Sequence, residues 1–208
     1  MLPSCALLSR GFFRFFRPPA PKILMCSKQE ENAFLHAESR SVTFPLDDRT
    51  QSVMNLMRNV HANFDDFVGI SAPQVGHHLR IILIEISREI YLTDNTAKEV
   101  VPLHFLINPT LKPIKKFGKS LDWESCYSIP DMVGEVLRYN CIEYTAYNIE
   151  GKIMKGVVRG LHARLLQHEV GHLDGKLYND HINQARFITK EKFLEIMNQR
   201  DSGFRNKR

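Results

Sequence analysis

Apolar positions recur with the period of an α-helix in several segments of the chain. In residues 50–64 they lie at i, i+3, i+4 and i+7, a spacing that places side chains on one helix face; these positions are Val53, Leu56, Met57 and Val60. We expect this helix to pack its apolar face on the core. Residues 160–173 and 189–200 are also predicted to be helices, and the second of these is amphipathic.

Other segments have the composition of β-strands. Residues 79–86 and 105–111 are rich in branched apolar side chains, and Pro109 is expected to close the second strand because proline cannot donate to a ladder. Residues 141–157 indicate a hairpin that turns at 148–151. Strands followed by one central helix, without repeats or a second domain, predict a single α+β domain rather than a doubly wound sheet.

Composition agrees with one folded domain. The chain has 208 residues, of which 43% are hydrophobic and 25% charged, and this suits a globular domain with a real core. No apolar run approaches the roughly 20 residues that span a bilayer, so no membrane span is expected. The formal charge is +5, but the first 29 residues hold five basic residues and no acid, so the remaining 23 basic residues balance the 23 acidic ones. Direct binding to nucleic acid is therefore not expected.

The basic excess belongs to the start of the chain. The stretch "MLPSCALLSRGFFRFFRPPAPK" combines arginines, aromatic residues and leucines without an acid, which is typical of a mitochondrial presequence. A secretory signal is disfavoured because its apolar region would have to contain Arg10 and Arg14. We expect residues 1–29 to be a presequence and the protein to act in the mitochondrial matrix; a disordered basic tail is the alternative.

The sequence "QHEVGH" contains a metal-binding pattern with one ligand missing. His168 and His172 flank Glu169, and positions i and i+4 of a helix share one face, so two imidazoles can converge on one cation. Hydrolytic metal sites usually need a third protein ligand. The metzincin continuation would place a histidine where Tyr178 stands, so that class is excluded. Gly175 is expected to end the helix.

The cysteines supply a candidate for the third ligand. In a reducing compartment, four cysteines do not form a disulfide framework. Cys5 and Cys26 fall within the predicted presequence. Cys141 lies in an alternating, strand-like run and is expected to be a small buried apolar residue. Cys126 lies in a short polar stretch that ends at Pro130, where packing does not demand a thiol, so Cys126 is the candidate ligand.

Three separated motifs resemble those of the peptide deformylase family. They are "GISAPQVG", "WESCYS" and "QHEVGHLDG", in the order and approximate spacing of that family, and "INP" between the first two is also similar. The resemblance covers about residues 45–185. With the leader, the chain resembles the mitochondrial peptide deformylases of animals. It implies one catalytic domain over residues 34–200, with antiparallel or mixed sheets around a central HExxH helix, followed by a basic C-terminal tail at 201–208.

The resemblance also implies an activity and a cofactor. The family removes the formyl group from the initiator N-formylmethionine of nascent polypeptides, here those synthesised in mitochondria. One divalent metal ion, Fe(II), Zn(II) or Co(II), would be held by Cys126, His168 and His172. Glu169 would act as the general base. The expected partners are N-formylmethionyl nascent peptides, and the exit region of the mitochondrial ribosome is a further candidate.

The remaining expected site residues also come from the family motifs. The side chain of Gln74 and the backbone N–H of Tyr127 would stabilise the oxyanion of the tetrahedral intermediate. A simpler interpretation of Gln74 is that it caps a turn. Four residues match positions that line the peptide substrate, namely Gly69, Trp123, Glu124 and Ser125.

Three positions depart from the family pattern. Ser125 and Phe67 each replace a glycine, and Gly171 replaces an aspartate that usually precedes the second histidine. None of these changes removes a ligand, the base or an oxyanion donor, so we expect an active enzyme. Two alternatives stay open: a non-catalytic relative that binds nascent chains or the mitochondrial ribosome, and a metal-dependent amidase of different specificity. The intact Glu169 favours catalysis, because a purely structural metal site needs no base.

Overall fold

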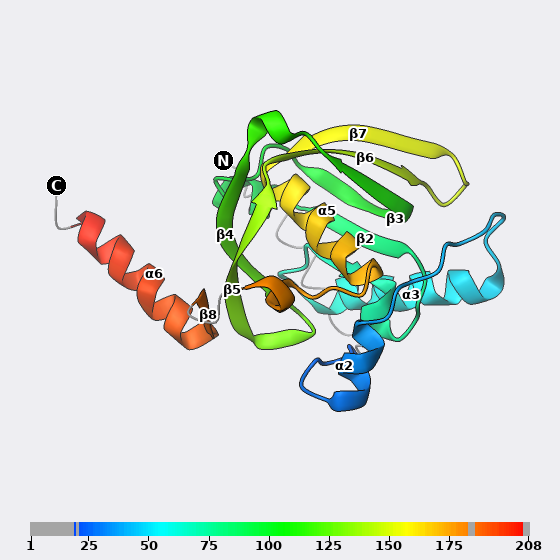
Figure 1. Ribbon diagram of the computed structural model, residues 1–208, viewed down its shortest axis with the longest axis horizontal. Coiled ribbons are helices and arrows are strands. Elements are labelled where there is room, and N and C mark those ends of the chain that lie inside the picture. The colour runs from blue at the N-terminus through cyan, green and yellow to red at the C-terminus, as the bar shows by residue number, and fades with distance from the viewer. Residues whose placement is uncertain (1–18, 20, 183–185, 206–208) are drawn as a thin grey trace, which may run out of the picture.

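The computed structural model describes residue 19 and residues 21–182 and 186–205. Two antiparallel sheets and a set of helices make an α+β fold, as the sequence predicts (Figure 1). One sheet has the strand order β1-β2-β3-β6-β7, with bounds Gly69–Ser71, Ile81–Ile86, Val101–Pro113, Cys141–Tyr147 and Ile153–Arg159. The other has the order β4-β5-β8, with bounds Lys119–Cys126, Ile129–Tyr139 and Phe187–Thr189.

One helix occupies the centre of the molecule. Helix α5 lies between the two sheets, whereas the last helix, α6, points away from the body (Figure 1). The α-helices of the described residues are α2 to α6, with bounds Gln29–Leu35, Asp48–Asn63, Arg88–Thr93, Gly160–Leu173 and Lys190–Arg205. Short 3-10 turns are η2, η3 and η4, with bounds Ala72–Val75, Lys115–Phe117 and Tyr178–His181.

Strand β2 is apolar almost throughout because it is covered on both faces. Ile81 and Leu83 belong to the core cluster that contains Met57 of α3. Ile82 and Ile84 belong instead to the cluster of α5. Since successive strand residues point to opposite faces, the continuous run "IILIEI" supplies two cores. This arrangement fixes α5 against the larger sheet.

Three local predictions are confirmed. The helix predicted at 50–64 begins at Asp48, because the side chain of Asp47 caps it by accepting from the Thr50 N–H at 2.8 Å. Helix α5 ends at Leu173, and Gly175 follows with a φ of 66°. Strands β6 and β7 form the predicted hairpin, in which the N–H of Gly151 donates to the carbonyl of Asn148.

Pro109 does not end its strand, so that prediction is wrong. Strand β3 continues to Pro113, with a shift of register between Ile107 and Thr110. Asn108 has a positive φ of 50°, and its side-chain amide bonds both the N–H and the carbonyl of Val42 at 2.8 Å. The proline is therefore tolerated at a bulge, where its missing N–H costs no ladder bond.

Both ends of the predicted domain extend further than its expected limits. Within the predicted presequence, Ile23 is buried and Cys26 is half-buried against the domain, whereas residues 1–18 lie outside the described part. Helix α6 runs to Arg205, so the tail expected at 201–208 begins inside a helix and its last three residues lie outside the described part. Among the described residues, no helix combines the length and the apolar character that crossing a bilayer requires.

Candidate active site and metal centre

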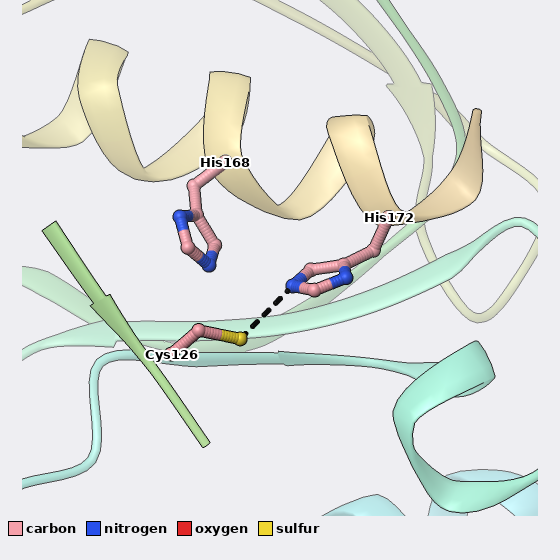
Figure 2. Close-up of side chains that lie close together, drawn as sticks. All are labelled: Cys126, His168 and His172. Carbon is pink, nitrogen blue, oxygen red and sulfur yellow. Dashed lines mark hydrogen bonds between the residues drawn. The ribbon is translucent and has the colours of Figure 1, made fainter. Parts of the chain in front are cut away.

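Three predicted ligands converge beneath helix α5. His168 and His172 project from consecutive turns of α5 toward Cys126 at the end of β4 (Figure 2). Their ligand atoms all lie within 4.8 Å of one another, and Sγ of Cys126 is 3.3 Å from Nε2 of His172. Among the described residues this is the one such group of histidine, cysteine and acidic side chains. One thiolate and two imidazoles fit a tetrahedral divalent cation with one open position.

Cys126 reaches this point because its polar stretch is part of a hairpin. Residues 119–126 form β4, which pairs with β5 along its length, and Cys126 is opposite Ile129 across the tight connection. The N–H of Ser128 points back to Sγ of Cys126 at 3.4 Å. Cys126 is buried, whereas Cys141 lies in β6 as a buried residue of the larger sheet, as expected. The fold therefore gives the two buried cysteines different environments.

A buried carboxylate orients the first histidine. Nδ1 of His168 lies 3.0 Å from Oε2 of Glu124, which leaves its other ring nitrogen for a metal. Arg138 donates to both oxygens of Glu124 at 3.0 and 2.9 Å, and Nη1 of Arg164 donates to Oε1 at 2.7 Å. Glu124 was expected to contact substrate. The structure gives its carboxylate these three partners, while the residue also lines the pocket.

The charges around the ligands shift their pKa values in opposite directions. Burial raises the pKa of Glu124, but hydrogen bonds from His168 and Arg138 outweigh burial and hold that pKa well below its usual range. Burial lowers the pKa of His168, but Cys126 and Glu124 outweigh it and raise the pKa to about 10. Burial and the nearby His168 lower the pKa of His172. A cation at this site must displace a proton from Nε2 of His168, while the proton on Nδ1 stays in the hydrogen bond to Glu124.

Glu169 is not one of the hydrogen-bond partners of Glu124. It is 3% exposed, and burial raises its pKa to about 7. Its Oε2 has no hydrogen-bond partner within the described part of the chain. A Cβ added at Gly69 would lie 2.7 Å from Oε1 of Glu169 and 2.9 Å from Cδ1 of Leu165. The glycine at this position therefore leaves room for a carboxylate that is free to exchange a proton.

Gln74 caps a turn, as the simpler interpretation of the sequence predicts, and its donor end points toward the ligands. Its Oε1 accepts from the N–H and the hydroxyl of Ser71 at 2.9 and 2.8 Å, so it caps the η2 turn. Its Nε2 points the other way, to Sγ of Cys126 at 3.4 Å and Oγ of Ser128 at 3.3 Å. The cap fixes which end of the amide is a donor. That donor faces the group of metal ligands.

A pocket of about 240 Å³ opens beside these groups. It is lined by Gln74, Cys126, His168 and Glu169, by the predicted substrate contacts Gly69, Trp123, Glu124 and Ser125, and by Tyr127. Its apolar wall includes Val68, Leu161 and Leu165. Ser125 is exposed, and its φ is not positive, so only close approach of a ligand can make a glycine preferable there.

Several residues that build the site were not predicted. Arg138 and Arg164 hold Glu124, and Ser71 and Ser128 hold Gln74. Only Arg164 had a signal in the sequence: it lies one helical turn before His168, so a charged residue shares the ligand face. Tyr178, which replaces the third histidine of other HExxH proteins, is buried and donates from its hydroxyl to the carbonyl of Met132 at 3.0 Å.

Comparison with known proteins gives one family throughout. Residues 24–187 match the family model described as "Polypeptide deformylase". The chain is 30% identical to peptide deformylase 2 of Rickettsia conorii, covering 80% of this chain and 83% of that protein. Peptide deformylase 2 of Coxiella burnetii is 34% identical over 81% of this chain and 80% of its own length.

Solved structures show the same relationship. A peptide deformylase of Synechococcus elongatus, in complex with actinonin, superposes with a TM-score of 0.65 at 25% identity, covering 81% of this chain and 82% of that one. The family model spans the three converging ligands, the buried glutamate and the capped glutamine. The chain therefore belongs to the peptide deformylase family.

Proposed function

We propose that this protein removes the N-formyl group from the initiator N-formylmethionine of polypeptides made in mitochondria. Family membership supports a metal-dependent hydrolase. The observation that carries the proposal is the convergence of Cys126, His168 and His172 beside the buried Glu169 in one pocket. That arrangement combines three metal ligands with a base that is not itself a ligand.

The cation would be held by the two imidazoles and the thiolate. Bound there, a divalent ion supplies a Lewis acid and lowers the pKa of a water molecule toward neutrality. Thiolate and imidazole ligands are compatible with Fe(II), Zn(II) and Co(II). His168 is kept in one orientation by Glu124, so its ring presents the same nitrogen throughout turnover.

The chain's own residues carry the proton and the charge. Glu169, with its pKa raised to about 7, takes a proton from the attacking water and passes it to the leaving amine. Nε2 of Gln74 and the N–H of Tyr127 donate to the oxygen that becomes negative. Losing one such donor typically costs about 2.7–4 kcal/mol of transition-state stabilisation.

The methionine side chain would occupy the apolar part of the pocket. Val68, Leu161 and Leu165 supply that wall next to His168 and Glu169. The formyl carbon would then lie near the ligands, with the peptide running out past Trp123 and Ser125. In this placement the substrate chain leaves the pocket after its first residue. A nascent polypeptide requires such an exit.

A mitochondrial location rests on the composition of residues 1–29. Fusion of these residues to a fluorescent protein should direct it to the mitochondrial matrix, and substitution of Arg10, Arg14 and Arg17 by glutamine should abolish import. Cytosolic fluorescence of the unmodified fusion would contradict the location. It would leave the chemistry of the site unaffected.

Anaerobic metal analysis and turnover on one sample test the activity. We expect about one equivalent of Fe, Zn or Co per chain and release of formate from formyl-Met-Ala-Ser. Metal at this ratio without formate release would favour the alternative, a non-catalytic relative that binds nascent chains or the mitochondrial ribosome. Hydrolysis of other linear amides in preference to formyl-Met peptides would identify a different amidase.

A further inference from the structure

The segment of residues 22–26, which precedes helix α2, contacts both parts of the site that carry the proposed oxyanion donors. The N–H of Leu24 donates to the carbonyl of Gln74 at 2.8 Å. The N–H of Cys26 donates to the carbonyl of Ser128 at 3.0 Å. Gln74 lies in η2 beside the larger sheet, and Ser128 lies in the connection between β4 and β5 of the smaller one. Two alternate amides of one segment therefore link the two sheets at the site.

The side chains of this segment are also shared between two cores. Ile23 is buried in the cluster that contains Met54 and Val75. Leu24 and Cys26 pack against the different cluster that contains Cys126 and Ile129. An extended chain can do this because neighbouring side chains point to opposite sides. The segment is thus held by packing as well as by its hydrogen bonds.

Helix α2 fixes the far end of the segment. Oε2 of Glu31 accepts from the N–H of Met25 at 2.7 Å, and its Oε1 lies 2.7 Å from Nζ of Lys22. The segment then turns, and the N–H of Lys28 donates to the carbonyl of Met25 at 3.2 Å. Residues 22–26 therefore have a defined position relative to both acceptors.

We propose that Leu24 and Cys26 are positioning residues for the oxyanion donors. Their amides hold the carbonyl of Gln74 and the carbonyl of Ser128, the residue after Tyr127, at a fixed separation. This role rests on the proposed deformylase activity. The side chain of Gln74 also bonds Cys126 and Ser128, but those bonds are lost when its Nε2 turns to the substrate. The bridge through residues 24 and 26 uses only backbone groups, so it persists during the reaction.

We expect kcat to depend on the backbone N–H of residue 26 and not on its thiol. Cys26→Pro removes the N–H, and residue 26 is the second residue of the turn from Met25 to Lys28, a position that favours proline. Cys26→Ala keeps the N–H and removes only the sulfur. We expect Cys26→Pro to lower kcat by up to about 10²-fold, since small misplacements of reacting groups have effects of that size.

Measurements other than kcat distinguish a loss of positioning from a general loss of stability. In Cys26→Pro, we expect one equivalent of metal and a KM for formyl-Met-Ala-Ser within about twofold of Cys26→Ala, because the ligands and the pocket wall are untouched. A fall in metal content parallel to the fall in kcat would overturn the proposal. So would equal kcat values in the two variants.

A double-mutant cycle tests the connection to Gln74. Leu24→Pro removes the other amide, and Ile23 lies outside any helix, the conformation that a following proline disfavours. If Leu24 acts through Gln74, Leu24→Pro should lower kcat much less in a Gln74→Ala background than in the parent. Fully additive effects would contradict the proposal, because damage unrelated to Gln74 adds independently.

If a proline variant fails to fold, a smaller change tests the role of the same N–H. Lactic acid can be incorporated at position 26 in place of alanine, which replaces the N–H by an oxygen atom. The only other change is that the Met25 carbonyl, which accepts from the Lys28 N–H, becomes a weaker ester acceptor. We expect this ester variant of the full chain to have a lower kcat than Cys26→Ala, and equal values would overturn the proposal. Absence of turnover in the metal-loaded parent would instead refute the deformylase activity, and the positioning role with it.

Discussion

Nε2 of Gln74 lies 3.4 Å from Sγ of Cys126, across 52 residues of sequence. The contact joins a proposed oxyanion donor to a proposed metal ligand. Because Ser71 occupies Oε1 of Gln74, the donor end of the amide faces the thiol. The same sulfur is 3.3 Å from Nε2 of His172. Cys126 is therefore the point where the ligand group and the donor group meet.

Cys126→Ala should abolish stoichiometric metal binding, because a thiolate ligand is lost. Cys141→Ala is the matched control, since Cys141 is also buried but belongs to strand β6. It should keep about one equivalent of metal and lose only packing free energy. Metal analysis after anaerobic reconstitution measures both. Full occupancy in Cys126→Ala would exclude the two-histidine, one-cysteine site.

Glu169→Gln and Glu169→Ala should keep the metal and lose turnover. Glu169 contributes a base and no ligand, and removal of such a base typically costs about 10²–10⁴-fold in rate. Metal content and formate release should be measured on the same preparation. A metal-loaded Glu169→Ala protein with parental kcat would show that a different group accepts the proton.

Glu124→Ala should affect both stability and metal affinity. The change leaves Arg138 and Arg164 without their shared carboxylate, and breaking such a buried pair typically costs about 3–5 kcal/mol in the free energy of unfolding. His168 also loses its orienting partner, which typically weakens metal binding about 10–100-fold. Asp122→Asn, at a half-exposed neighbour in the same strand, should change stability by less than about 0.5 kcal/mol. Urea unfolding and metal titration test this, and equal effects of the two changes would contradict it.

Gly69→Ala should lower kcat because its new methyl group would meet Oε1 of Glu169 at 2.7 Å. The carboxylate must then move, and displacement of a catalytic group by about 1 Å can cost about 10²-fold. In contrast, a Cβ at Gly171 meets its nearest neighbour, the carbonyl of Lys176, at 3.4 Å. Gly171→Ala should therefore stabilise α5 by up to about 1 kcal/mol with little change in rate. Parental kcat in Gly69→Ala would mean that Glu169 tolerates the shift.

Ser125→Gly should raise kcat/KM for formyl-Met peptides with metal content unchanged. Ser125 is exposed on the wall of the pocket, beside Cys126, and its side chain narrows the approach of a peptide backbone to β4. The gain is limited to at most a few kcal/mol, because small shifts at the end of β4 relieve an obstruction of two heavy atoms. Identical kinetics of the two proteins would show that the position tolerates a side chain.

The ligand group could be predicted because its residues lie in short motifs. His168 and His172 are one turn apart on a helix, and the motif around Cys126 singled out that cysteine. The partners of Glu124 could not be found in this way. Arg138 reaches it from strand β5 and Arg164 from helix α5, and only the packing of α5 between the sheets brings them together.

Two further differences have specific physical causes. Pro109 indicates the end of a strand because it lacks an N–H. A bulge at Asn108 lets the strand continue past the proline. The pattern of apolar residues does not reveal a bulge. Residues 22–28 contain no acidic residue, like the leader before them. Composition alone therefore assigns these residues to the leader. The burial of Ile23 and the hydrogen bonds of Leu24 and Cys26 depend on two sheets that are distant in sequence, and a local pattern does not contain that information.

The buried side chain of Ile23 and the backbone hydrogen bonds of Leu24 and Cys26 would limit where a processing peptidase could cut. If the leader is removed on import, cleavage after residue 29 would also remove the amides of Leu24 and Cys26 and the buried side chain of Ile23. An imported enzyme would keep this segment only if its mature N-terminus lay at Lys22 or before it. A peptidase that cut a few residues too late would release a chain that keeps every metal ligand but lacks the backbone bridge through residues 24 and 26.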